Sequence, residues 1–123
     1  MSNLNESLPI YIRIVEGIKD HILSEELKEE SQLPSTTYLS KEYKINIATV
    51  NKAVNQLVDQ GLVYKKRGIG MFVKAGAVKK LIDERRSVFK ERYIKATLVE
   101  ARRLNFTVDE LQKLVQETYK EIK

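Results

Sequence analysis

The stretch KINIATVNKAVNQLVDQGLV, residues 44–63, decides the fold. Its apolar residues recur at the spacing of one stripe along an α-helix, and they are Val50, Ala53, Val54, Leu57 and Val58. The other face collects small, amide-bearing and lysine side chains in place of the Glu and Lys mixture of a solvated helix, namely Ala48, Asn51, Lys52, Asn55 and Gln56. Asn46 is suited to cap this helix, and Gly61 is suited to follow its end. The stretch therefore predicts a helix over 47–60 with a polar face that needs an explanation.

The bulk composition describes a small protein without sulfur chemistry. The chain has 123 residues, of which 42% are hydrophobic, enough for one modest domain or a small domain with an appendage. Cysteine is absent, which excludes a disulfide framework and a thiolate metal site and fits a reducing cytoplasm. No apolar run approaches the ~18 residues of a membrane span, and the polar N-terminus MSNLNESLP lacks a signal-peptide core. We expect a soluble, cytoplasmic protein that does not enter a membrane.

Positive charge gathers in the middle of the chain. Residues 1–40 carry three basic and seven acidic side chains, whereas residues 41–74 carry seven basic and two acidic ones. Residues 75–123 carry twelve basic and eight acidic side chains. A basic middle segment is expected of a surface that meets a polyanion such as a nucleic acid.

The elements before and after the helix predicted at 47–60 predict a winged helix-turn-helix. A stripe between Ile10 and Ile22 predicts a first helix, and Ser35 is placed to cap a short second one. After Gly61, the runs LVY and MFV are strand-like, and KKRGIG between them indicates the tip of a hairpin. Two helices joined by a tight turn and followed by a small β-ribbon form this fold, which we assign to residues 1–74.

Residues 75–123 predict a two-helix tail. The apolar spacing predicts a long helix from 78 to about 104, followed by a turn at Asn105. The capping box TVDE at 107–110 predicts the start of a last helix. Roughly fifty residues are too few to enclose a core, so the apolar stripes pack either against the first domain or against a second copy of the chain. We expect a dimer formed by Leu81, Val88, Phe89, Tyr93, Leu111, Leu114, Val115 and Tyr119. The fold class is thus mainly α with a small β-hairpin.

The motifs LPIY, LPS, ATVNKAVNQLVDQGLV and GIGMFV, in this order, resemble the N-terminal domain of the GntR family of bacterial transcription regulators over residues 8–74. The tail with EARRLNFTVDELQKLVQE resembles the YtrA-type subfamily, which has a short dimerising tail in place of a large ligand-binding domain. The resemblance implies a dimeric DNA-binding regulator, most simply a repressor on a palindromic operator, that controls neighbouring transporter genes.

The resemblance places DNA contacts at the start of the second helix, in the first turns of the helix at 47–60, called the recognition helix, and at the tip of the hairpin, called the wing. The residues at these places are Ser35, Thr36, Thr37, Asn46, Ile47, Ala48, Thr49, Asn51, Lys52, Asn55, Lys65, Lys66, Arg67, Gly68 and Gly70. The chain departs from the family pattern because Thr37 and Asn51 stand where relatives often carry arginine, and Ile47 stands where they usually carry arginine or proline. Glu30 replaces a usual glycine, and Met71 replaces the threonine of GTFV. Asparagine pairs with adenine N6 and N7, so we expect A·T base pairs where this face reads the operator.

Other interpretations of the same residues stay open. An amide-bearing face can be merely solvated, and Lys65, Lys66 and Arg67 can serve only to keep a hairpin edge soluble. A winged helix can also act as a protein adaptor or bind structured RNA by shape. His21 has no second histidine nearby, and no nucleophile–base pair or phosphate loop is evident. We therefore expect no enzyme, metal or cofactor, double-stranded DNA and a second copy of the chain as partners, and an effector that the sequence leaves unknown.

Overall fold

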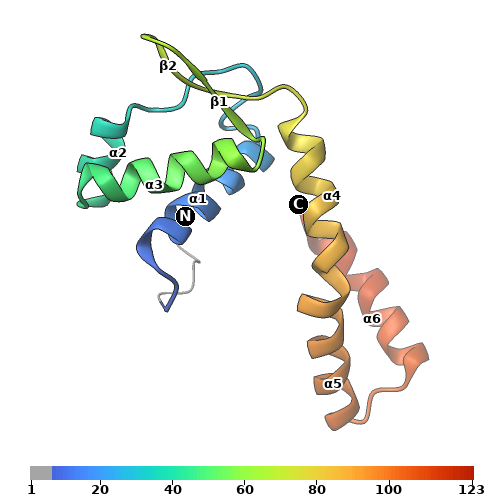
Figure 1. Cartoon of the computed structure of the whole chain (residues 1–123). Coiled ribbons are helices and arrows are strands. Elements are labelled where there is room, and N and C mark those ends of the chain that lie inside the picture. The colour runs from blue at the N-terminus through green and yellow to red at the C-terminus, as the bar shows by residue number, and fades with distance from the viewer. Residues whose placement is uncertain (1–6) are drawn as a thin grey trace. The chain divides into compact units, whose positions relative to one another are not determined.

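The computed structural model describes residues 7–123, which divide into two compact units between Asp83 and Glu84 (Figure 1). The first unit contains three helices and a hairpin, in the predicted order, and the first part of a fourth helix. Their bounds are α1 Ile10–Leu23, α2 Thr36–Tyr43, α3 Ile47–Asp59, β1 Val63–Lys66 and β2 Gly70–Val73. The predicted layout of helix, helix, turn, helix and hairpin is confirmed.

Local hydrogen bonds set the ends of α2 and α3. The Ser35 hydroxyl accepts the backbone N–H of Tyr38 at 3.0 Å, and the Asn46 side-chain oxygen accepts that of Thr49 at 2.9 Å. Each cap satisfies a donor that the helix itself leaves unpaired. After α3, Gly61 has a φ of +74°, the left-handed value that suits glycine. The predicted caps are confirmed, and the turn between α2 and α3 is fixed by residues within it.

The core of the first unit lies where α1, α3 and the hairpin meet. Val50, Ala53 and Leu57 of α3 are fully buried, and α1 makes the most extensive helix contact with α3. Burial of each large apolar side chain is worth about 1.5–3 kcal/mol. The buried cluster comprises Ile14, Val15, Ile18, Ile22, Leu33, Leu39, Val50, Ala53, Val54, Leu57, Leu62, Val63, Val73, Ala77 and Leu81. This packing turns the apolar stripe of α3 inward and leaves its amide-bearing face outward.

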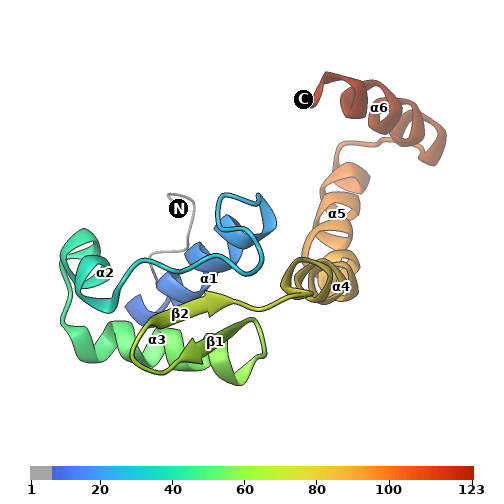
Figure 2. The same ribbon diagram turned by 90° about the horizontal axis from the view of Figure 1, so that it is seen from above.

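The segment before α2 is tied to the hairpin. Strands β1 and β2 are antiparallel, with Val63 opposite Val73 and Lys66 opposite Gly70. The backbone N–H of Leu33 donates to the carbonyl of Met71 at 2.8 Å, and that of Val73 donates to the carbonyl of Ser31 at 2.9 Å. The wing is therefore braced against the chain that leads into α2, as Figure 2 shows.

Glycine at Glu25 is expected to stabilise the first unit. Glu25 and Glu30 have φ values of 62° and 68°, left-handed backbone that disfavours a residue with a Cβ by roughly 1–2 kcal/mol. Glu25→Gly should raise the free energy of unfolding by about 0.5–1 kcal/mol after the greater entropy of unfolded glycine is subtracted. Urea denaturation measures this change. Glu30→Gly is the comparison variant and should gain less, because Tyr64 donates its hydroxyl to Glu30 Oε2 at 2.8 Å. A destabilised Glu25→Gly would contradict the strain.

A distant carboxylate holds the start of α4 (Ala77–Phe89). Glu29 Oε1 accepts the N–H of Gly76 and Glu29 Oε2 accepts that of Val78, both at 3.0 Å. These bonds, first from Gly76 and then from Val78, lower the pKa of Glu29 below its ordinary value of 4.5. The periodicity of the sequence gave no sign of this contact.

Acid is expected to release the Glu29 cap. A lowered folded-state pKa means that the cap stabilises fully above the unfolded pKa and that this stability is lost as pH falls through the folded pKa. Glu29→Gln should therefore melt at a lower temperature than wild type at pH 7, by a few degrees, and the difference should shrink as the pH falls below 4.5, the ordinary pKa of glutamate. Thermal unfolding between pH 7 and 3 measures it, with Glu16→Gln as control. An equal difference at all pH values would contradict the ionised cap.

In the second unit, the long predicted helix has an unpredicted π-helical turn. The last residues of α4 are followed directly by η1 (Lys90–Ile94) and α5 (Lys95–Arg103), and α6 spans Val108–Glu121. Such a turn inserts one extra residue into the helical repeat. Asn105 has a φ of 63°, and Thr107 and Glu110 form a reciprocal capping box. The predicted turn and capping box are confirmed, and in Figures 1 and 2 α6 leaves the turn at an angle to α5.

Most of the apolar tail residues are exposed within the chain. Val115 and Tyr119 are 61% and 77% exposed, and the rings of Phe89 and Tyr93 are exposed and contact each other with centroids 5.5 Å apart. Leu81 differs, because it is fully buried in the core of the first unit. Its predicted place in a dimer surface is therefore corrected. In the part of the chain that is described, no helix is long and apolar enough to cross a bilayer.

Candidate nucleic-acid interface

The outer face of α3 is an open polar surface. Asn51 and Asn55 lie one helical turn apart and are exposed, with Lys52 beside them. Together with the neighbouring residues of the same face they form a shallow concavity, lined by Ala48, Asn51, Lys52, Asn55, Gln56 and Asp59. The amide groups are thus presented outward on a helix whose other side is locked into the core.

A groove of about 310 Å³ joins the three predicted contact regions. It runs between the start of α2, the face of α3 and the wing. Its lining residues are Gln32, Leu33, Pro34, Ser35, Thr36, Asn51, Val54, Asn55, Lys65, Ile69, Gly70 and Met71. Six of the residues predicted from the resemblance therefore share one groove, although they come from three separate segments.

Other predicted contact residues lie outside this groove. Thr37, Ile47, Lys66, Arg67 and Gly68 are exposed on the surface. Asn46 and Thr49 serve the fold first. The Thr49 hydroxyl donates to Asn46 Oδ1 at 3.0 Å, and the same oxygen accepts the Thr49 backbone N–H. A phosphate oxygen needs a donor, so the Thr49 hydroxyl in this arrangement is directed elsewhere.

The wing tip is held by a residue that the sequence analysis did not single out. Gln32 Nε2 donates to the carbonyl oxygen of Ile69 at 3.1 Å. A Cβ at Gly70 would lie 2.5 Å from Gln32 Nε2, so glycine is what allows this approach. The arrangement leaves the Ile69 side chain 63% exposed at the tip of a basic hairpin. The close approach is made at Gly70, whereas a Cβ at Gly68 would meet nothing within 4 Å, and the approaching residue comes from a distant segment.

Aromatic rings support two of the lysines at the surface. Lys66 Nζ lies 4.9 Å from the centroid of the Phe72 ring, and that ring stacks on Tyr64 with centroids 5.8 Å apart. Lys52 Nζ lies 4.0 Å from the centroid of the Tyr11 ring. A ring face attracts a cation without neutralising its charge. Both ammonium groups therefore remain able to attract an anion.

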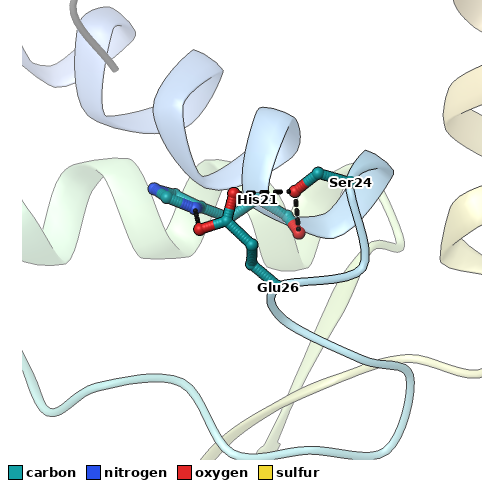
Figure 3. A network of polar contacts seen from close by, with 3 residues as sticks. All are labelled: His21, Ser24 and Glu26. Atoms are coloured by element: carbon teal, nitrogen blue, oxygen red, sulfur yellow. Dashed lines mark hydrogen bonds and ion pairs between the residues drawn. The ribbon is translucent and has the colours of Figure 1, made fainter. Parts of the chain in front are cut away.

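A separate polar network lies at the end of α1 (Figure 3). His21 Nδ1 and Glu26 Oε2 are 2.9 Å apart, and the Ser24 hydroxyl donates to Glu26 Oε1 at 3.1 Å. The Ser24 hydrogen bond, followed by the contact with His21, lowers the pKa of Glu26 below its ordinary value. Within residues 7–123 no group of three or more His, Asp or Glu side chains is placed to hold a metal ion. The network joins residues close in sequence, and none of its three residues lines the groove beside α3.

Comparison with known proteins bears on the whole chain. Over 117 residues it is 26% identical to the transcriptional repressor YtrA of Bacillus subtilis, which covers 95% of this chain and 89% of YtrA. It is 37% identical over 71 residues to the repressor NagR of the same organism, covering 58% of this chain. The chain spans only 29% of the length of NagR. The relatives are transcription regulators, and the YtrA-type resemblance is confirmed by the near full-length match.

Solved structures agree with these relatives. A GntR-family regulator from Bacteroides thetaiotaomicron matches with a TM-score of 0.71 and 30% identity, over 92% of this chain and 98% of that one. The DNA-binding domain of AraR in complex with operator ORX1 matches with a TM-score of 0.54 and 31% identity, over 59% and 89%. The winged helix-turn-helix class is thereby confirmed. The model of the bacterial regulatory proteins of the gntR family matches residues 10–73, which include α1 to α3 and the wing, and so this chain belongs to the GntR family.

Proposed function

We propose that this protein is a dimeric transcription repressor that binds a palindromic operator. In the proposed complex α3 enters the major groove, the start of α2 contacts phosphates and the wing contacts the backbone or minor groove of DNA. The observation that carries the proposal is the groove that joins Ser35, Asn51, Asn55 and Lys65. The repressor names of NagR and YtrA, and the operator bound by AraR, support it by relationship.

Base recognition in this proposal rests on asparagine. Asn51 and Asn55 are exposed at adjacent turns of the outer face, and an asparagine amide pairs with adenine N6 and N7 in the major groove. Ile47, which is 46% exposed at the start of α3, offers an apolar surface to a thymine methyl group. The half-sites are therefore proposed to be rich in A·T pairs at the positions that α3 faces.

Phosphate contacts in this proposal come from the edges of the interface. Lys65, Lys66 and Arg67 extend from the wing, and Lys52 lies beside the amides of α3. Contacts of this kind orient the protein on DNA and release counterions, so affinity falls steeply with salt. Sequence recognition and salt dependence are thus expected to arise from different residues.

Dimerisation in this proposal uses the second unit. Its exposed apolar residues include Phe89, Tyr93, Leu114, Val115 and Tyr119. A pair of short helices with this much apolar surface in water is marginally stable by itself and is expected to need a partner surface. A second copy of the tail is the proposed cover. Two recognition helices related by a two-fold axis would then lie about 34 Å apart, one turn of DNA.

Selection from a random DNA pool followed by titration tests the proposal. The purified chain is expected to enrich a palindrome with A·T-rich half-sites, and anisotropy should show that a scrambled duplex binds far less tightly. Between 50 and 200 mM salt the affinity should fall by roughly 10³-fold or more if six or more phosphates are contacted. Equal binding to the scrambled duplex, tighter binding to an RNA hairpin or no salt-dependent binding would reject it, and the last result would favour a protein adaptor.

A further inference from the structure

Lys52 is the single basic side chain of α3, so the position of its ammonium group decides where this helix can bind a phosphate. It lies on the outward face beside Asn51 and Asn55. A lysine ends in a mobile point charge on a four-carbon stem, and its helix does not by itself fix the position of the ammonium group. Something else must therefore hold the charge if Lys52 is to meet one phosphate reproducibly.

Tyr11 provides that restraint from another helix. Its ring centroid lies 4.0 Å from Lys52 Nζ, well within the range of a cation–π contact. Tyr11 sits near the start of α1, is half-buried and packs against the buried core cluster. Because α1 has its most extensive contacts with α3, the ring is a fixed platform and the lysine head is the mobile partner.

We propose that Tyr11 is a positioning residue for DNA binding, which holds the Lys52 ammonium group at the edge of the reading face so that it meets a phosphate without first being ordered. The ring occupies one side of the ammonium and leaves N–H donors for an anion on the other. This inference rests on the proposed function, because it presumes that α3 faces DNA.

The contact between Tyr11 and Lys52 has two rival interpretations, which predict different effects on DNA affinity. If the ring competes with phosphate for the ammonium group, removing the ring should tighten DNA binding. If the pair serves only to join α1 to α3, removing it should change thermal stability without changing how the two residues act on DNA. A positioning role instead predicts weaker DNA binding that depends on the presence of Lys52.

A double-mutant cycle on DNA affinity separates these cases. The variants are Tyr11→Leu, Lys52→Gln and their combination, with Tyr11→Phe retaining the ring and Lys28→Gln as a control for charge outside the interface. The probe is the duplex that the wild-type chain selects from random DNA, titrated by anisotropy at several salt concentrations. Melting temperatures of all variants are recorded so that the titrations use folded protein.

Tyr11→Leu is expected to weaken binding about three- to tenfold per half-site, the effect of having to order one long side chain on binding. Tyr11→Phe should stay within twofold of wild type. Lys52→Gln should reduce the slope of log K against log salt by about one per half-site. In the Lys52→Gln background, Tyr11→Leu should have no further effect.

Three results would overturn the inference, and one would instead overturn the proposed function. Tighter binding by Tyr11→Leu, unchanged binding, or losses that add independently of Lys52 would each remove the positioning role while leaving a DNA-binding protein. Failure of the wild-type chain to select any duplex would reject the proposed function itself.

Discussion

Alanine at both Asn51 and Asn55 is expected to abolish operator recognition while leaving binding to unrelated DNA nearly unchanged. Each well-placed amide–adenine pair is worth about 1–3 kcal/mol of discrimination. Two amides in each of two half-sites therefore predict a loss of at least about a thousandfold on the selected palindrome. The proposed phosphate contacts of the wing are left intact, so affinity for a scrambled duplex and its salt slope should stay within a few-fold of wild type.

A modified base turns this prediction into an atomic test. Replacing the contacted adenines of the selected duplex by 7-deazaadenine removes the N7 acceptor without removing the base. The modified duplex should bind wild type more weakly and the double variant no differently from the unmodified one. If wild type does not distinguish the two duplexes, or if the double variant loses affinity equally for operator and scrambled DNA, the amides do not read adenine N7.

Glutamate at both Val115 and Tyr119 is expected to convert the proposed dimer into monomers and to weaken operator binding at least about a hundredfold. The two side chains are 61% and 77% exposed on α6, and a dimer interface would bury them. Unpaired charges buried at that interface would disfavour association by several kcal/mol. Separated half-site readers then lose the millimolar effective concentration that linkage provides. Sedimentation equilibrium measures the mass, and anisotropy with the selected duplex measures the affinity.

Lys113→Glu provides the matched control for this tail variant. This substitution also alters the charge on α6. Lys113 is two residues from Val115, which is about 200° around the helix, so it lies on the opposite face. It should remain dimeric and bind normally. The thermal transition of the first unit should be similar in both variants, since neither position belongs to its core cluster. A glutamate double variant that stays dimeric would assign dimerisation to another surface.

The sequence alone predicted those features whose partners lie within a few residues. Ser35, Asn46 and Thr107 were placed as helix caps because a cap bonds a backbone N–H two or three positions ahead. Gly61 and Asn105 ended their helices in left-handed backbone, as expected. The apolar stripe of α3 likewise predicted which face is buried, since helical periodicity is a local property.

The candidate site was only partly predictable. The contact positions 35–37, 46–49, 51, 52, 55, 65–68 and 70 were named from their resemblance to a family. The structure joins some residues of all three regions in one groove. Gln32 and Tyr11 were missed. Each acts on a residue more than thirty positions away, Ile69 and Lys52 respectively. Neither residue type nor spacing distinguishes such a partner from an ordinary polar or aromatic side chain.

Tertiary packing decided the remaining features. Leu81 has the spacing of a tail residue, but folding places it in the first unit's core, where its apolar surface is removed from water. Glu29 lies in the polar, acidic stretch SEELKEESQ, yet it caps a helix that begins 48 residues later at Ala77. Local hydrogen bonding and periodicity depend on neighbours in the chain, and so the sequence determined helices, caps and the outward face of α3. Contacts between distant segments depend on how whole elements pack, and only the tertiary structure decided which side chain holds the wing and which ring holds the lysine.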